Sequence, residues 1–322
     1  MKVLVIGASG FVGRRLLNSL AGREGIEVVA GLRVARAEMA GVEQRLFDAC
    51  DPAATRQAMA GITHVVNGVM GSAETMVCAT RSIADAARAA GVKRLVHFSS
   101  TAVFGQATGS LCDTSPFGGD VDAYGQAKIE CENIVAAVGM AGLETVILRP
   151  ALIYGPGSEP WTARVGRLLR WHRLGDLGPA GDGLCNLVFI DDVVSAAMAA
   201  LTAPEVSGRA FNLAPSDPPT WNRYLMDFAR EIGAVPVHRV SGRQLKLELK
   251  LVAIPLKIAE IFRDKLRLRW LPVPDPITPS LGRLFAQEIR YRASGAYALP
   301  GVVETPYSDG LKAAARWFLK DV

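Results

Sequence analysis

The chain has 322 residues, of which 50% are hydrophobic and 21% are charged, a composition that excludes intrinsic disorder and supports a sizeable core. No stretch holds the ~20 apolar residues that a membrane span needs, and the N-terminus lacks the long apolar core of a signal peptide. The formal net charge is +5, and most of this excess lies within residues 246–269.

Short apolar runs alternate with helical patterns through the first half of the chain. Lys2–Ile6 is an apolar run that stops at a glycine and predicts a buried strand, and the apolar spacing of Phe11–Leu20 predicts a helix. Further strands are expected at 26–32, 63–67, 94–99 and 143–148, and further helices at about 73–90 and 123–138. This alternation predicts an α/β fold of right-handed βαβ units, with a doubly wound parallel sheet covered on both faces.

The alternation ends at Pro150, beyond which prolines and glycines interrupt the chain. A helix at 192–201 and a strand at 210–213 are expected to return to the sheet. We therefore predict a first domain of residues 1–150 with about 186–214. A smaller, discontinuous C-terminal lobe would consist of residues 151–185 and 215–322 and would supply the substrate pocket.

A glycine-rich turn, Gly7-Ala8-Ser9-Gly10-Phe11-Val12-Gly13, joins the first strand to the first helix. Glycine permits the tight turn and brings backbone N–H groups close to phosphate oxygens, to which a helix N-terminus adds partial positive charge. The spacing is G-x-x-G-x-x-G rather than the G-x-G-x-x-G fingerprint of dinucleotide-binding folds. Its position predicts a Rossmann-type pyrophosphate site; a tight turn without a ligand is the alternative. The expected contacts come from Gly7, Ser9, Gly10, Phe11, Val12 and Gly13.

Arginines follow the second expected strand, where dinucleotide-binding folds contact the adenosine ribose. Arg33 and Arg36 stand there, and the first carboxylate comes only at Glu38. A guanidinium suits the 2′-phosphate of NADP, whereas a carboxylate favours NAD. We therefore expect NADP, with NAD as the alternative cofactor; a pair of solvated arginines is the structural alternative. Asp48, with Ala49 beside it, is placed at the adenine amino group, unless Asp48 caps the helix that follows.

Three polar side chains form the candidate catalytic set. Tyr124 and Lys128 are four residues apart, on one face of the expected helix, and Ser100 follows an expected strand whose carboxyl end faces the ligand crevice. A phenol has a pKa near ~10, which a neighbouring ammonium together with the positive nicotinamide of the oxidised cofactor would lower. Tyr124 would be general acid in reduction and general base in oxidation, Lys128 would also hold the nicotinamide ribose, and Ser100 would orient the substrate oxygen. A surface Tyr–Lys pair and a capping serine are the structural alternative.

Taken together, these motifs resemble the extended short-chain dehydrogenases/reductases, the NAD(P)-dependent epimerase/dehydratase family. The group contains sugar epimerases and dehydratases, hydroxysteroid dehydrogenases and dihydroflavonol reductases. The matching pieces follow family order over about residues 1–215: 7–13, Asp48, 65–69, 98–105, 124–128, 148–157 and 189–193. In the family pattern the catalytic hydroxyl lies three residues before a valine, and Val103 therefore selects Ser100.

The resemblance implies further contacts and one partner. Gly68 and Val69 would line the cofactor cleft, and Pro150 and Ile153 would lie by the nicotinamide. Related enzymes pair through the helices that correspond to 73–90 and 123–138, which implies a homodimer.

The chain departs from the pattern of the nucleotide-sugar members of this family. Leu152 stands where those members carry asparagine, and Cys185 stands near the place of an arginine; both usually hold the substrate diphosphate. Phe104 also replaces the usual tyrosine. Since a diphosphate without such donors binds poorly, the departures favour a less charged small-molecule substrate, such as a hydroxy-ketone or a steroid-like, polyketide or lipid-linked molecule.

We therefore expect an NADP-dependent ketoreductase or alcohol dehydrogenase. An epimerase or dehydratase that transiently oxidises a sugar is the alternative, and a non-catalytic cofactor-binding module is the third hypothesis. Five widely spaced cysteines without a C-x-x-C predict neither a disulfide framework nor a metal site and favour the reducing cytoplasm.

The basic segment 246–269 holds seven basic and three acidic residues with few aromatics between them, a pattern that does not favour a nucleic-acid partner. We expect a solvated helix face, with contact to an anionic substrate tail or peripheral contact with a membrane surface as the alternatives. The apolar stretch 245–271 would either wall an apolar pocket or pack in the core.

Overall fold

The computed structural model describes residues 1–39, 41–248, 255, 262 and 275–322. The chain divides into two compact units. Unit 1 consists of Met1–Ile153, Val188–Ser216 and Tyr291–Thr305, and unit 2 of Tyr154–Leu187, Asp217–Arg290 and Pro306–Val322.

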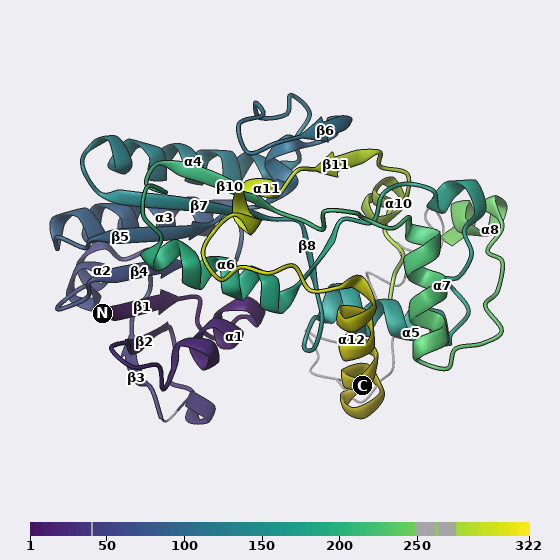
Figure 1. Ribbon diagram of the computed structural model, residues 1–322, viewed down its shortest axis with the longest axis horizontal. Helices are drawn as coiled ribbons and strands as arrows, with labels where there is room; N and C mark the ends of the chain where they lie inside the picture. Colours follow the sequence, from purple (N-terminus) through teal and green to yellow (C-terminus); the bar gives the residue numbers. More distant parts are fainter. Residues whose placement is uncertain (40, 249–254, 256–261, 263–274) are drawn as a thin grey trace. The chain divides into compact units, whose positions relative to one another are not determined.

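Unit 1 is built on a parallel sheet, which has seven strands among the described residues, in the order β10-β7-β5-β4-β1-β2-β3 (Figure 1). The strands are β1 (Lys2–Ile6), β2 (Glu27–Leu32), β3 (Glu43–Leu46), β4 (His64–Asn67), β5 (Arg94–Phe98), β7 (Glu144–Pro150) and β10 (Arg209–Leu213). Leu4 of β1 is opposite Val29 of β2 and Val65 of β4, so the order reverses beside β1. The predicted Rossmann-type, doubly wound fold is confirmed.

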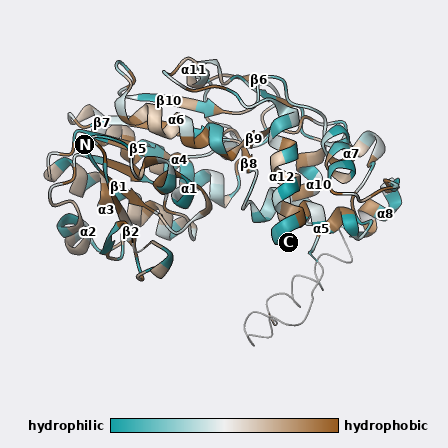
Figure 2. Ribbon diagram, turned by 60° about the horizontal axis from the view of Figure 1, so that its bottom comes forward, coloured by the Kyte–Doolittle hydropathy of each residue, from teal (hydrophilic) through white to brown (hydrophobic). Residues whose placement is uncertain are grey.

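Helices cover both faces of this sheet. The helices α2 (Pro52–Ala58), α3 (Ala73–Ala89) and α4 (Ala123–Met140) lie on one face, and α1 (Phe11–Leu20) and α6 (Ile190–Thr202) lie on the other (Figure 1). The central strands β1, β4, β5 and β7 are largely buried, because parallel strands under two helical layers have no solvated face; β1 is brown in Figure 2. The edge strand β3 is polar and partly exposed. Leu4, Val65 and Leu95 of the sheet share one core with Ile83 of α3 and Val135 of α4.

Residues 291–305, which the sequence analysis assigned to the second lobe, pack within unit 1. Asp192, which is buried in α6, accepts the Thr305 backbone N–H at 3.1 Å. The Tyr297 hydroxyl of the short helix α11 (Ser294–Tyr297) donates to Ala214 O at 3.0 Å. These contacts join residues about 80 or more positions apart, and no local pattern in the sequence encodes them.

Unit 2 is helical and has an aromatic core. Among the described residues of this unit, the α-helices are α5 (Arg164–Arg170), α7 (Trp221–Glu231), α8 (Gly242–Leu247), α10 (Pro279–Phe285) and α12 (Tyr307–Asp321). Tyr224 stacks on Phe228 with ring centroids 5.7 Å apart, and Trp221 meets Phe285 edge-on at 5.1 Å. The described residues of the chain also form the short strands β6 (Gly109–Leu111), β8 (Leu152–Tyr154), β9 (Leu187–Phe189) and β11 (Ile289–Tyr291), and the short turns of helix η1 (Ala37–Met39), η2 (Thr101–Phe104), η3 (Glu159–Ala163) and η4 (Gly178–Gly181).

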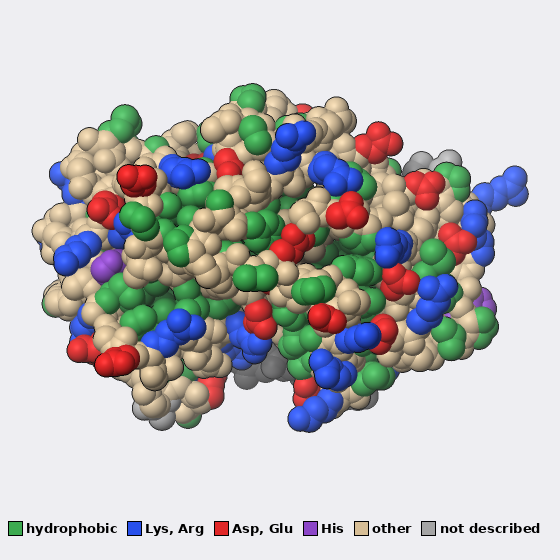
Figure 3. Space-filling model, in the orientation of Figure 1, with side chains coloured by type: hydrophobic (Ala, Val, Ile, Leu, Met, Phe, Trp, Pro, Cys, Tyr) green, Lys and Arg blue, Asp and Glu red, His purple; other side chains and the backbone are tan. Residues whose placement is uncertain are grey.

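Charged side chains of both signs are interspersed over the described residues on the face drawn in Figure 3. Most of the basic segment 246–269, and with it most of the apolar stretch 245–271, lies outside the described residues. Among the helices that the structure does describe, none has the length and apolar character needed to cross a membrane.

Candidate active site

Ser100, Tyr124 and Lys128 lie together at the carboxyl end of β5. α4 begins where Asp122 Oδ1 accepts the Gly125 N–H at 2.8 Å, and the helix presents Tyr124 and Lys128 one turn apart. Lys128 is 2% exposed; its Nζ donates to the Phe98 carbonyl at 2.8 Å and lies 5.8 Å from the centroid of the Tyr124 ring.

The Ser100 side chain hydrogen-bonds Tyr124. It also caps the short turn Thr101–Phe104, because its Oγ accepts the Ala102 N–H at 3.2 Å. The Ser100 hydroxyl thus caps the turn and also contacts Tyr124 in the candidate site. The turn holds this hydroxyl in place, and Ser100 remains partly accessible.

Burial dominates the acid–base properties of Tyr124 in the protein without cofactor. Burial raises the pKa of Tyr124, and the hydrogen bond from Ser100 lowers that pKa by less. Burial also lowers the pKa of Lys128, while the negative charge of Glu132 acts in the opposite direction. In the protein alone, desolvation outweighs the hydrogen bond with Ser100, and Tyr124 is held as the neutral phenol.

A buried ion pair supports this site from one helical turn further along α4. Glu132 is 3% exposed and forms a bidentate pair with Arg149 of β7, at 2.9 Å (Oε1 to Nε) and 2.7 Å (Oε2 to Nη2). Ser99 Oγ donates to the same carboxylate at 2.5 Å. The pair therefore ties β5, β7 and α4 together directly beside Ser100 and Lys128. The pair was not predicted from the sequence, although Tyr124, Lys128 and Glu132 follow one another at intervals of four.

A second buried network lies on the neighbouring strands. The Asn67 side chain is 3.1 Å from His97 Nδ1 and 3.1 Å from Thr80 Oγ1, and its oxygen accepts the Val69 N–H at 3.1 Å. Burial and, to a lesser degree, the positive charge of Lys128 hold the pKa of His97 well below its usual value. His97 is therefore neutral and adds no second positive charge beside the ammonium.

The glycine turn at residues 7–13 closes against the end of β4. Gly7 has φ +84°, and a Cβ there would lie 2.3 Å from Gly68 O. A Cβ on Gly13 would lie 2.3 Å from Gly7 O. The turn therefore needs glycine for its own close packing, and this packing brings Gly68 next to the glycine turn.

The N-terminus of α1 is not capped by a side chain. Gly10 is the N-cap residue and offers none, and the first turn carries no acidic residue. In contrast, Asp51, Ser72 and Asp122 cap α2, α3 and α4. Ser9 and Gly10 are exposed, and Phe11 and Val12 are half-buried. The first N–H groups of α1 therefore fit a phosphate, as a dinucleotide pyrophosphate requires.

The residues expected at the adenosine end lie at the carboxyl ends of β2 and β3. Arg33 and Arg36 are exposed, and neither guanidinium forms an ion pair with another described residue. Asp48 does not cap α2; it accepts the Cys50 N–H at 2.9 Å and is otherwise exposed, while Asp51 is the cap. Ala49 beside it is buried.

Of the other expected cofactor contacts, Gly68, Val69 and Pro150 lie at the carboxyl ends of sheet strands, and Ile153 lies in the short strand β8 outside that sheet. Gly68 and Val69 directly follow β4 and are partly accessible. Pro150 ends β7, the strand that pairs with β5, and is buried, whereas Ile153 lies in β8 and is half-buried. Among the described residues, no cluster of three or more His, Cys, Asp or Glu side chains is placed to hold a metal ion.

Comparison with known proteins places this geometry in a family. Residues 3–214 match the NAD dependent epimerase/dehydratase family. The chain belongs to that family. It is therefore a nicotinamide-dependent enzyme of the oxidoreductase and epimerase kind, and the resemblance seen in the sequence is confirmed.

Two relatives carry the names of reductases. The chain is 32% identical over 259 residues to a 2-alkyl-3-oxoalkanoate reductase of Stenotrophomonas maltophilia, covering 74% of this chain and 78% of the relative. It is 30% identical over 260 residues to a 3-diazoavenalumate denitrifying reductase of a Streptomyces species, covering 73% and 83%. Among solved structures, the UDP-glucose 4-epimerase of Thermus thermophilus in complex with NAD superposes with a TM-score of 0.74 over 100% of both chains. At 21% identity this similarity concerns the fold.

Replacing Gly13 by alanine tests whether the glycine turn is set by close packing. Helix propensity alone would make Gly13→Ala stabilising by about 1 kcal/mol. The contact at 2.3 Å with Gly7 O predicts the opposite, a loss of about 1–3 kcal/mol in thermal or urea unfolding. Gly119→Ala, where no atom lies within 4 Å of the new Cβ, is the control. A stabilised Gly13→Ala protein would contradict this description.

Glu132→Gln removes the buried carboxylate and leaves Arg149 without its anionic partner. We expect a loss of about 3 kcal/mol in the free energy of unfolding, measured by urea denaturation. Glu130→Gln is the matched control, because Glu130 pairs with Arg81 at 3.5 Å with both side chains more than half exposed, a contact worth at most ~1 kcal/mol. Equal losses in the two variants would refute a structural role for the buried pair.

The low pKa of His97 predicts a pH-dependent stability. The unfolded chain takes up a proton near pH 6.5, while the folded protein keeps His97 neutral to lower pH. Stability should therefore fall as the pH drops below 6.5, by at most about 1.4 kcal/mol per pH unit from this group. His97→Gln lacks this contribution, so its unfolding free energy should change less between pH 7 and pH 5. Parallel curves for the two proteins would show that His97 is not the cause.

Proposed function

We propose that this protein is an NADP-dependent reductase of a ketone in a small, largely apolar substrate. The observation that carries the proposal is the hydrogen bond between Ser100 and Tyr124 beside the buried ammonium of Lys128. A phenol and a hydroxyl that meet at one point can both contact a single carbonyl oxygen. Both lie at the carboxyl end of β5, the edge of the sheet where the glycine turn also lies.

The chemistry needs a hydride at the carbonyl carbon and a proton at the carbonyl oxygen. A bound nicotinamide supplies the hydride. Tyr124 Oη donates the proton, and Ser100 Oγ hydrogen-bonds the same oxygen and fixes its position. Lys128 Nζ, anchored on the Phe98 carbonyl, stabilises the phenolate that remains on Tyr124.

The direction of the Tyr124 pKa favours reduction. Burial raises this pKa, so the phenol carries its proton when the substrate arrives and can serve as the acid. Oxidation of an alcohol would need the phenolate first, which the buried site disfavours. The protonated phenol of the protein without cofactor is therefore the form that ketone reduction uses.

NADP is the cofactor that the arginines favour over NAD. Arg33 and Arg36 follow β2, are exposed and have no carboxylate partner among the described residues. Two such guanidiniums can bind a 2′-phosphate with charge-assisted hydrogen bonds.

The uncharged residues Leu152 and Cys185, at the two positions where nucleotide-sugar enzymes of the family hold a diphosphate, favour a ketone without a nucleotide as the substrate. Cys185 is fully buried, and burial raises the pKa of its thiol well above the usual value, so it carries no charge for a diphosphate. Leu152 is apolar. A relative named 2-alkyl-3-oxoalkanoate reductase shares 32% of the aligned residues, and we take a 3-oxo group flanked by alkyl chains as the first substrate to test.

An epimerase is the second candidate, because a relative named UDP-glucose 4-epimerase of Vibrio cholerae is 27% identical over 229 residues. Nicotinamide absorbance separates the two functions. A reductase consumes one NADPH for each ketone reduced, whereas an epimerase returns its cofactor unchanged after each turnover. Conversion of UDP-glucose to its 4-epimer without net NADPH consumption would establish the second function instead.

Tyr124→Phe removes the proposed proton donor and keeps the ring. The rate of ketone reduction should fall by roughly 10²- to 10⁴-fold, while the Kd for NADPH stays close to that of the unchanged protein. Tyr297→Phe, which removes a phenol bonded to the Ala214 backbone, is the control and should retain its rate. A Tyr124→Phe protein with more than about a tenth of the normal rate would rule out this residue as the acid.

Arg33→Ala combined with Arg36→Ala tests the cofactor preference. The Kd for NADPH should rise at least about tenfold, and the Kd for NADH should change little, because only NADPH has the 2′-phosphate. Arg23→Ala is the control, since Arg23 is exposed but bonds Ser19 O within α1. If both cofactors weaken equally, the arginines do not bind the 2′-phosphate. Isothermal titration calorimetry measures the affinity of each of the three proteins for each cofactor.

A further inference from the structure

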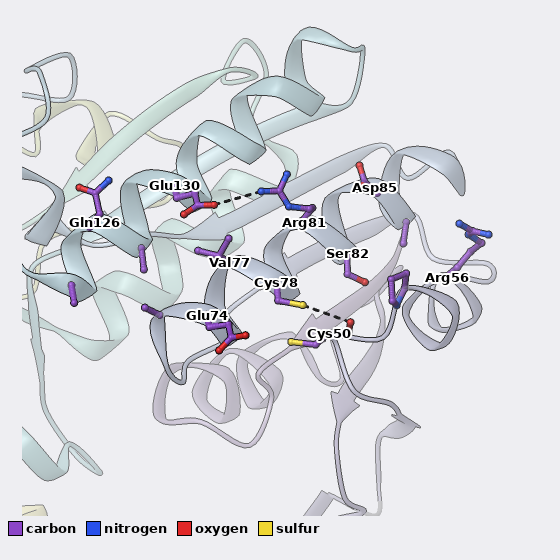
Figure 4. A pocket seen from close by; sticks show the side chains of 15 residues that line it. Cys50, Arg56, Glu74, Val77, Cys78, Arg81, Ser82, Asp85, Gln126 and Glu130 are labelled. Carbon is purple, nitrogen blue, oxygen red and sulfur yellow. Dashed lines mark hydrogen bonds and ion pairs between the residues drawn. The ribbon is translucent and has the colours of Figure 1, made fainter.

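Two free thiols meet on the surface of unit 1, outside the candidate active site. Cys50 lies in the turn before α2, and Cys78 lies on α3. The Cys78 thiol points at the Cys50 carbonyl, with Sγ to O 3.7 Å, and the Cys50 thiol at Thr75 O, with Sγ to O 3.6 Å. The two side chains also hydrogen-bond each other. Figure 4 shows both sulfur atoms on the wall of one open cavity of about 720 Å³.

We propose that Cys50 and Cys78 form a disulfide bond within the chain when a peroxide oxidises them. The 27 intervening residues include all of α2 and β4, so the spacing in the sequence gives no hint of the pair. Cys50 lies outside any helix or strand, and its turn can move the short distance that bond formation requires. The bond needs sulfur atoms about 2 Å apart, closer than two hydrogen-bonded thiols.

The order of the two steps follows from exposure. Cys78 is exposed and Cys50 is partly buried. The Cys78 thiolate attacks the peroxide, the O–O bond breaks, and Cys78 becomes a sulfenic acid as one water leaves. The Cys50 sulfur then attacks the Cys78 sulfur, the S–O bond breaks, and the second water leaves with the Cys50 proton. Two thiols are oxidised, and one peroxide is reduced to two waters.

Burial and the neighbouring thiol raise the pKa of Cys50 to about 11. Cys50 therefore stays protonated at neutral pH and is not the thiol that reacts with the peroxide; it has to lose its proton as it attacks the sulfenic acid of Cys78.

The disulfide would act on the adenosine end of the candidate cofactor site, an effect that rests on the proposed function. Asp48 accepts the Cys50 N–H at 2.9 Å, and Ala49 lies between them in the chain. Drawing Cys50 toward α3 must displace this turn, since the sulfurs have to approach. We expect the oxidised protein to bind NADPH several-fold more weakly, and dithiothreitol to restore binding.

The test uses the full chain with Cys112→Ser. Hydrogen bonds from Ser115 and Thr114 lower the pKa of the exposed Cys112 to about 7, so this thiol would react with peroxide as well. The protein is treated with hydrogen peroxide, alkylated with N-ethylmaleimide and digested with trypsin without reductant. Tryptic peptides 46–56 and 57–81 should appear joined, with a mass about 2 Da below their sum. The matched variants are Cys50→Ser and Cys78→Ser, each combined with Cys112→Ser. After peroxide treatment they should show no joined peptide, and their Kd for NADPH should be the same before and after the treatment.

The outcomes separate this proposal from the proposed function. If Cys78 is converted to sulfinic acid or stays alkylatable while no joined peptide forms, the disulfide is refuted; an inaccessible groove in a homodimer would give that result. If the joined peptide forms but the Kd for NADPH is unchanged, coupling to the cofactor site is refuted. If the joined peptide forms and the reduced protein binds no NADPH, the disulfide is supported and the proposed function fails.

Discussion

A buried ammonium is the constraint around which the candidate site is arranged. Lys128 is 2% exposed, and an ammonium so deep in a protein needs a partner that offsets its lost hydration. The Phe98 carbonyl provides one hydrogen bond at 2.8 Å, and the negative charge of Glu132 one turn away raises the pKa that burial lowers. The centre of the Tyr124 ring lies 5.8 Å from Lys128 Nζ. This position follows from α4, the helix that carries both residues.

The parallel sheet supplies the rest of the arrangement. β5 ends at Phe98, so that Ser99 and Ser100 emerge at the edge where β7 ends with Arg149 and Pro150. The Glu132–Arg149 pair joins α4 to that edge with two hydrogen bonds. Because the glycine turn and the end of β4 lie on the same edge, the fold brings hydroxyls, a lysine and free helix N–H groups to one side of unit 1.

Those strands and helices that depend on short-range patterns could be predicted from the sequence. The bounds of β1 and α1 agree with the expected ones, because a buried strand and an amphipathic helix each have a period that can be read locally. Ser100 and Tyr124, 24 positions apart, do meet, as the order of strands and helices required. Two features were missed: the packing of residues 291–305 within unit 1, and the pairing of Glu132 with Arg149. Each depends on contacts between residues that are distant in the chain. The burial that raises the pKa of Tyr124 in the protein without cofactor was also missed, since the degree of burial cannot be read from a motif.

Transfer of deuterium tests most directly whether Ser100, Tyr124 and Lys128 serve ketone reduction. NADPH carrying deuterium on each face of the nicotinamide C4 in turn is mixed with enzyme and a 2-alkyl-3-oxo acid, and the product is analysed by mass spectrometry and NMR. One of the two labelled cofactors should place a single deuterium on the former carbonyl carbon, at a rate that Tyr124→Phe lowers sharply. Recovery of unlabelled alcohol from both cofactors, or equal transfer by Tyr124→Phe, would contradict a hydride transfer assisted by this phenol.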